Sequence, residues 1–338
     1  MSTTSAPTTF SELYTDLLNR VRADSTTTSQ LTLAKRYINL ANQDLHIQQN
    51  FPWAERRAIL QTNAPDTTGT VSIALSARTT VNGVGTVFNT AVTGMGFNTC
   101  RAGGKMVFAG TTDPYTVASV TSDTLLTLTD RWLGNTALSG AAYTYYEDEY
   151  SLATDFFRMV DTRNFTDVLN IPIIGRQEFY RRFPRNSSRA GVPEVCTIID
   201  LGPTTTTTSQ IRVVFHPYPD QTLNIPYRYM TTNLAVSATG TQATDMSGDT
   251  DEPIIPLRYR HALVLYAAQQ WYRDRKDDAR AQEVGAEYVD LVKRMSGDSN
   301  PERDRPRFVP QKNRYPIFLG RRGQARYSTG SAFDEMRE

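Results

Sequence analysis

Three consecutive acidic residues, Glu147, Asp148 and Glu149, follow a run of tyrosines in the stretch YTYYEDEYSLATDFFR. Two carboxylates can hydrolyse a glycosidic bond when they face each other across about 5–9 Å and one of them has a raised pKa. A metal site would need further oxygen or nitrogen ligands, and the stretch lacks the alternating aspartates and glycine of a calcium loop. In a strand, Glu147 and Glu149 share one side and Asp148 takes the other. Adjacency in the sequence therefore supplies neither catalytic nor metal-binding geometry.

The acidic stretch is better explained as a joint between two kinds of structure. Tyr143 to Tyr146 are predicted to be the last strand of a β module. The acidic residues 147–149 are predicted to be solvated, where they would also suit the N-terminal end of a following helix. Leu152, Phe156 and Phe157 would then mark the return of the chain into a helical body.

No other pattern in the sequence indicates an enzyme. The three histidines lie in different segments, none has a partner at zinc-ligand spacing, and His46 and His261 are predicted on helix surfaces. The glycine-rich stretches lack the third glycine of a dinucleotide fingerprint and the spacing of a phosphate-binding loop. We therefore predict no catalytic residue, no cofactor and no metal, while a catalytic triad assembled across the fold stays an open alternative.

The segment 298–338 mixes arginines with aromatic residues and prolines, and such a segment cannot bury enough surface to fold alone. Nucleic acid would suit it, because cations bind phosphates and aromatic rings stack on bases. A protein groove would suit it too, and a merely solubilising tail is the third alternative. We favour the protein groove, because the prolines and large apolar residues exceed what phosphate binding needs. The residues predicted to contact this partner are Arg303, Arg305, Arg307, Phe308, Arg314, Tyr315, Phe318, Arg321, Arg322 and Tyr327.

Helical periodicity marks both ends of the chain before this tail. Thr9 and Glu12 have the spacing of a capping box, and apolar residues then recur at intervals of three and four. The spacing predicts helices over 10–50, with a polar break, and over 257–296. Gly297 is a natural helix end.

Between the helices the sequence favours strands. Residues 58–147 are rich in Thr, Val, Gly and Ser and fall into short strand-like runs, which is typical of a small barrel or sandwich. Residues 195–199 and 211–215 flank a threonine-rich run and predict a hairpin. Residues 225–230 are expected to add a third strand.

The composition fits a folded, intracellularly made protein. The chain has 338 residues, is 39% hydrophobic and 21% charged, and carries a formal net charge of +1. No apolar run approaches the ~20 residues that span a bilayer. The two cysteines, Cys100 and Cys196, make no paired motif, and the first residues do not resemble a secretion signal.

These patterns predict an α+β fold. Its helical body is built from N-terminal and C-terminal helices, with an inserted small β-barrel or sandwich, a β-hairpin segment and an extended C-terminal tail. The predicted segments are the N-terminal helices, the β module, the return segment with the hairpin, the C-terminal helices and the tail. Their boundaries are 8–57, 58–147, 148–256, 257–297 and 298–338.

Four stretches, taken in order, resemble the head-to-tail adaptor (connector) proteins of short-tailed bacteriophages, specifically the SU10-like adaptors. LAKRYINLANQDLHIQQNFPWAERRA is similar to the family's opening helix, and the segment from KMVFAG to ATDFFR is similar to its inserted barrel. VPEVCTII with IRVVFHPYPDQTLNIPYRYM resembles its later hairpin. DEPIIPLRYRHALVLYAAQQWYRDRKDDARAQEVGAEYVDLVKRM resembles its long C-terminal helices. The resemblance lies in the order of these parts, and it covers most of residues 30–296.

This resemblance implies a structural protein of the virion neck and tail, made in the host cytoplasm. It implies a homo-oligomeric ring, in this family a dodecamer, docked on the portal protein. Double-stranded DNA would pass through its channel without being read, tail or nozzle and fibre proteins would attach to it, and no membrane would be involved. Two alternatives stay open, a virion-associated hydrolase that uses Glu147 or Glu149, and a carbohydrate- or receptor-binding β protein of the tail.

Overall fold

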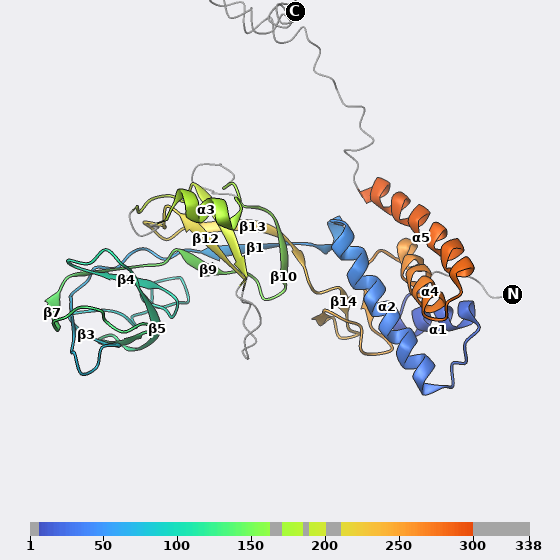
Figure 1. Cartoon of the computed structure of the whole chain (residues 1–338), viewed down its shortest axis with the longest axis horizontal. Coiled ribbons are helices and arrows are strands. Elements are labelled where there is room, and N and C mark those ends of the chain that lie inside the picture. Colours follow the sequence, from blue (N-terminus) through green and yellow to red (C-terminus); the bar gives the residue numbers. More distant parts are fainter. Residues whose placement is uncertain (1–6, 163–170, 185–188, 201–210, 300–338) are drawn as a thin grey trace, which may run out of the picture. The chain divides into compact units, whose positions relative to one another are not determined.

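The computed structural model describes residues 7–162, 171–184, 189–200 and 211–299 (Figure 1). The chain divides into two compact units. The helical unit comprises the described residues within 1–52 and 247–338, and the β unit comprises those within 53–246. Both helices and strands contribute, so the predicted α+β class is confirmed at that level.

The helical unit contains α1 (Phe10–Val21), α2 (Thr28–Gln48), α4 (His261–Asp274) and α5 (Asp278–Ser299). A short 3-10 turn, Leu257–Tyr259, precedes α4. Within this unit α4 packs against α1, α2 and α5, as Figure 1 shows. The buried side chains come from the apolar faces that the sequence spacing marks, and include Phe10, Leu13, Leu17, Tyr37, Ile38, Leu45, Leu263, Trp271 and Met295.

The start of α1 confirms the predicted capping box. The Thr9 hydroxyl accepts a hydrogen bond from the Glu12 backbone, and the Glu12 carboxylate accepts one from the Thr9 backbone. Both bonds satisfy donors that the first helical turn leaves without intrahelical partners. The helix ends at Arg22, whose φ of 55° turns the chain away from the helix axis.

The β unit contains one large, curled sheet of seven antiparallel strands (Figure 1). The strand order is β7-β2-β3-β6-β5-β4-β8. Burial alternates along the short strands, as a curled sheet with one filled face requires. The strands are β2 (Thr70–Ile73), β3 (Thr80–Val84), β4 (Lys105–Phe108), β5 (Tyr115–Ser122), β6 (Leu125–Leu128), β7 (Leu138–Ala141) and β8 (Tyr143–Tyr146). The core of the sheet includes Val71, Val81, Phe88, Phe108, Leu126, Trp132 and Tyr145.

Two three-stranded sheets complete the main part of the β unit. In one, β13 (Asn224–Thr231) lies between β1 (Glu55–Gln61) and β10 (Phe156–Thr162). In the other, β12 lies between its hairpin partner β11 and the short β9, in the order β11-β12-β9. Their bounds are β11 (Val195–Asp200), β12 (Ile211–His216) and β9 (Glu149–Ser151), and α3 (Arg176–Arg182) packs against β11.

The predicted hairpin is therefore confirmed, with Val195 opposite His216 and Asp200 opposite Ile211. The predicted third strand forms as β13, but it pairs with β1 and β10 rather than with the hairpin. Small two-residue strands, β14 (Ala235–Val236), β15 (Gln242–Ala243) and β16 (Glu252–Pro253), follow it in the chain.

The prediction that Leu152, Phe156 and Phe157 lead back into helices is wrong. Phe156 begins β10, and its ring stacks on Tyr229 of β13 at a centroid distance of 5.7 Å. Leu152 belongs to the same buried cluster, while Phe157 is 40% exposed. The pattern failed here because a pair of adjacent aromatic residues suits a strand with one buried side as well as a helix.

None of the helices in the described part of the chain is both long and apolar enough to cross a membrane.

Candidate functional site

Two of the three acidic residues that follow β8 are buried, and the side chain of the third, Glu149, is 20% exposed, which corrects the prediction that they are solvated. Glu147 is 4% exposed and Asp148 is 1% exposed. A buried carboxylate is costly unless cations and hydrogen-bond donors surround it. Arg101, just before β4, and Lys105, the first residue of β4, provide those cations. These residues are distant in sequence, so adjacency within the acidic run gave no sign of them.

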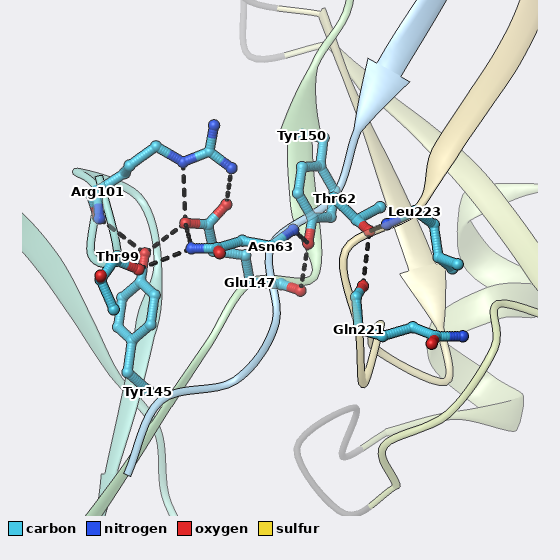
Figure 2. Close-up of polar contacts among 9 residues, drawn as sticks. All are labelled: Thr62, Asn63, Thr99, Arg101, Tyr145, Glu147, Tyr150, Gln221 and Leu223. Atoms are coloured by element: carbon cyan, nitrogen blue, oxygen red, sulfur yellow. Dashed lines mark hydrogen bonds and ion pairs between the residues drawn. The ribbon is translucent and has the colours of Figure 1, made fainter. Parts of the chain in front are cut away.

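Glu147 is held by a network that we call the Glu147 network (Figure 2). The Arg101 Nε donates to Oε1 at 3.0 Å, and a terminal nitrogen of the same guanidinium donates to Oε2. The Tyr145 hydroxyl donates to Oε1 at 2.5 Å, and the Asn63 side-chain amide donates to the same oxygen at 3.4 Å. Both carboxylate oxygens are therefore engaged within the protein.

Backbone contacts extend this network to the neighbouring loops. The Tyr150 hydroxyl donates to the Glu147 carbonyl at 3.0 Å and accepts from the Asn63 backbone at 3.3 Å. The adjacent Thr62 hydroxyl donates to the Gln221 carbonyl at 2.9 Å and accepts from the Leu223 backbone at 2.8 Å (Figure 2). The network thus joins the end of the large sheet to the loop that leads into β13.

A glycine makes room for the network. A Cβ atom at Gly104 would lie 2.1 Å from the Tyr145 hydroxyl oxygen. With no side chain there, Tyr145 can accept a hydrogen bond from the Arg101 backbone at 2.8 Å while it donates to Glu147. The position of the tyrosine hydroxyl therefore depends on the absence of a side chain at Gly104, the residue directly before β4.

A second group of charges, which we call the Lys105 cluster, lies beside the first. The Lys105 ammonium contacts Asp148 at 2.8 Å and Glu149 at 3.0 Å. Arg212 of β12 approaches the other oxygen of Glu149 at 3.7 Å, which exceeds hydrogen-bonding distance. Strand pairing explains the lysine, because Lys105 of β4 stands opposite Tyr146 of β8, next to the acidic run.

Electrostatics favour the charged state of both cations. Burial alone would lower the pKa of Arg101 and of Lys105, but the neighbouring carboxylates outweigh it and leave each pKa raised. For Arg101 the carboxylate is Glu147, and for Lys105 the carboxylates are Asp148 and Glu149. Burial, followed by the charge of Glu147, raises the pKa of the Tyr145 hydroxyl. Tyr145 is therefore neutral at physiological pH and acts as a hydrogen-bond donor.

Both groups of charges border a cleft of about 370 Å³. Its walls mix polar and apolar side chains from β1, from the segment that precedes β4, from β9 and from β12. The lining residues are Ile59, Leu60, Gln61, Phe97, Arg101, Ala102, Gly103, Gly104, Glu147, Glu149, Tyr150, Ser151 and Arg212.

The cysteines and histidines do not form a reactive centre in the described residues. Burial raises the pKa of the Cys100 thiol, and it raises the pKa of Cys196 to about 12, so both thiols stay protonated. His46, predicted on a helix surface, is 5% exposed and packs edge-on against Phe51, so that prediction is wrong. His261 has a 44% exposed side chain, in agreement with its predicted surface position. His216 stacks on Phe183 with ring centroids 3.8 Å apart.

Metal ligands do not gather in the part of the chain that the structure describes. Within it, no group of three or more His, Cys, Asp and Glu side chains is placed to hold a metal ion. The predicted partner-binding residues from Arg303 to Tyr327 lie outside the described residues.

No protein-family model matches the chain, and no curated protein matches it.

Sequence reasoning found the acidic residues of this site but missed Arg101, Lys105, Arg212 and Tyr145. One signal was available for Lys105. The strand runs KMVF and YTYY are the same length, and pairing them places Lys105 beside the acidic run. For Arg212, which comes from a different sheet, no local pattern in the sequence gives the contact.

Proposed function

We propose that this chain is a structural, non-enzymatic head-to-tail adaptor of a short-tailed bacteriophage. In this proposal it forms a ring under the portal, continues the DNA channel and carries the tail or nozzle. The ring is expected to be a dodecamer, as in the family that the sequence resembles. The virion neck is then its location.

The observation that carries the proposal is the way the chain is divided. α1 and α2 come before the β unit in sequence, α4 and α5 come after it, and these helices share one compact unit. The stretches that resemble the adaptors' opening helix and long C-terminal helices supply α2, α4 and α5. The stretches that resemble the family's inserted barrel and later hairpin supply strands of the β unit. The order and the spatial grouping of the parts both suit an adaptor.

The Glu147 network supports a structural role over a hydrolase. A general acid must present its carboxyl group to the substrate within hydrogen-bonding reach. Both oxygens of Glu147 instead bond to Arg101 and Tyr145, and Glu149 bonds to Lys105. These contacts are those of an ion-pair network that fixes the end of the large sheet.

The test is assembly on portal rings. The purified full-length protein is mixed with rings of its portal protein, and the mass and symmetry of the product are measured by native mass spectrometry and electron microscopy. We expect a closed ring of this protein on each portal ring. A protein that stays unattached at micromolar concentrations of both components would refute the adaptor function.

A truncated chain tests the predicted role of the C-terminal segment. Deletion of residues 298–338 should leave a folded protein, judged by its circular dichroism and thermal melt, that no longer co-sediments with portal rings. Full co-sedimentation of this variant would show that the segment is not the attachment element, while the adaptor function itself would stand on the ring measurement.

A further inference from the structure

Arg212 carries a buried donor for which the structure provides no acceptor. Its side chain is 28% exposed, but its Nε is buried and has no hydrogen-bond partner in the described part of the chain. Its nearest acid is Glu149, at 3.7 Å from a terminal nitrogen, and Glu149 already bonds to Lys105 at 3.0 Å. A buried donor without a partner is destabilising, so an acceptor that reached it would be stabilising.

A second guanidinium on the same cleft has a free side. Arg101 directs its Nε and one terminal nitrogen at Glu147, and its other terminal nitrogen lies away from that carboxylate (Figure 2). The guanidinium carbon lies 4.2 Å from the centre of the Phe97 ring, which fixes its plane. Arg101 and Arg212 both line the cleft.

The cleft has space next to these arginines. A Cβ atom at Gly103 would lie 3.2 Å from a terminal nitrogen of Arg212, and the residue has a φ of +91°. Glycine at this position therefore leaves the end of the guanidinium uncovered. On another side the wall is apolar, formed by Leu60, Phe97 and Ile59, and Ile59 is 63% exposed.

We propose that this cleft binds a small organic anion, with its carboxylate or phosphate group on Arg212 and Arg101 and its apolar body against Ile59 and Phe97. Planar guanidinium groups match the oxygens of both head groups. The cleft already holds balanced charges, because its two arginines, Arg101 and Arg212, lie beside its two acids, Glu147 and Glu149. A ligand of low charge is therefore preferred over a polyanion. The binding site does not rest on the adaptor function.

Three probes that share a phenyl ring test which head group the cleft binds. Phenyl phosphate, benzoate and uncharged phenol are titrated into the full-length protein, and binding is followed by isothermal calorimetry. We expect at least one of the two anions to bind with a Kd below about 10 mM and phenol not to bind. The anion that binds more tightly identifies the head group. If neither anion binds with a Kd below about 10 mM, or if phenol binds as tightly as the anions, the proposal is overturned.

Matched arginine variants locate the site. Arg212→Gln should weaken binding of the anion at least about tenfold, which corresponds to one lost charge-assisted bond of about 1.4 kcal/mol. Arg189→Gln removes an arginine of the β unit that pairs with Glu194 at the surface, and it should leave binding unchanged. Equal weakening by both variants, or none by Arg212→Gln, contradicts the assigned site.

Two further measurements keep the test decisive. Ile59→Ser changes an exposed residue and should reduce the preference for phenyl phosphate over inorganic phosphate without abolishing phosphate binding. If Arg212→Gln does not fold, the Arg212 Nε–H resonance of the unaltered protein is observed by nuclear magnetic resonance during the titration. A shift that saturates with the ligand supports the site, and an unmoved resonance in the presence of bound ligand refutes it.

Discussion

Arg101 binds the buried Glu147 carboxylate at two points, with Nε on one oxygen at 3.0 Å and a terminal nitrogen on the other. Arg101 comes four residues before β4, and Glu147 directly follows β8, the edge strand that pairs with β4. The ion pair therefore closes the end of the large sheet where the chain crosses to β9.

Neutralising Glu147 should destabilise the β unit. Glu147→Gln leaves Arg101 partly buried without its counter-charge, and we expect the free energy of unfolding to fall by about 3 kcal/mol. This is the lower end of the range for buried pairs, because the Arg101 side chain is 32% exposed. Urea unfolding measures the change. The control is Glu178→Gln, which breaks an exposed pair with Arg182 on α3 and should cost less than about 0.5 kcal/mol. Equal losses for the two variants would contradict a structural role of the Glu147 network.

Adding one methyl group beside Tyr145 should also destabilise the β unit. Gly104→Ala places a Cβ atom against the Tyr145 ring and hydroxyl, which must then move away from Glu147. We expect a loss of about 1–3 kcal/mol, the usual cost of overpacking. Gly191→Ala is the matched control, since its added Cβ would meet only the Pro217 side chain, at the ordinary contact distance of 3.8 Å. A melting temperature lowered by Gly104→Ala and unchanged by Gly191→Ala is the expected result.

The adjacent phenylalanines of β10 should respond very differently to truncation. Phe156 is 4% exposed and stacks on Tyr229, so Phe156→Ala should cost about 3–5 kcal/mol. Phe157 is 40% exposed, so Phe157→Ala should cost less than about 1 kcal/mol. Chemical denaturation of the two variants tests this contrast. A larger loss at Phe157 would mean that the strand has the opposite face buried.

Acid should weaken the helical unit through His46. Burial lowers the pKa of this histidine below 6.5, and a hydrogen bond from Nδ1 to the Asn42 carbonyl offsets the effect only in part. The unfolded chain therefore binds a proton more readily than the folded one. The stability linked to His46 is present above pH 6.5, and it is lost as the pH falls through the lowered pKa of His46 in the folded protein.

The measurement is the slope of the unfolding free energy against pH between about 7 and 5. His46→Gln should make this slope shallower, because glutamine does not titrate. His261→Gln, at an exposed position, should leave the slope unchanged. An identical slope in the unaltered protein and in His46→Gln would contradict the link between the buried ring and acid sensitivity.

The features that were predicted correctly from the sequence depend on residues that lie close together in the chain. The capping box joins Thr9 to Glu12 within one turn, and the hairpin of β11 and β12 follows from two β-branched runs on either side of a short segment. The state of Glu147 depends on residues that are distant in sequence, because Arg101 and Asn63 contact it only in the folded β unit. The pairing of β1 with β13 joins Glu55 to Met230, and no local period could indicate it. The sequence located the acidic run but could not show its burial.

The division of the chain also sets how it responds to mechanical load. Among the described residues, the helices on both sides of the β unit belong to the helical unit, and the β unit is an insertion between Pro52 and Ser247. A force that pulls α1 and α5 apart passes first through the contacts among α1, α2, α4 and α5. The Glu147 network and the sheets around it come under tension only after those helices have separated. The β unit is thus shielded from axial pulling for as long as the helices hold.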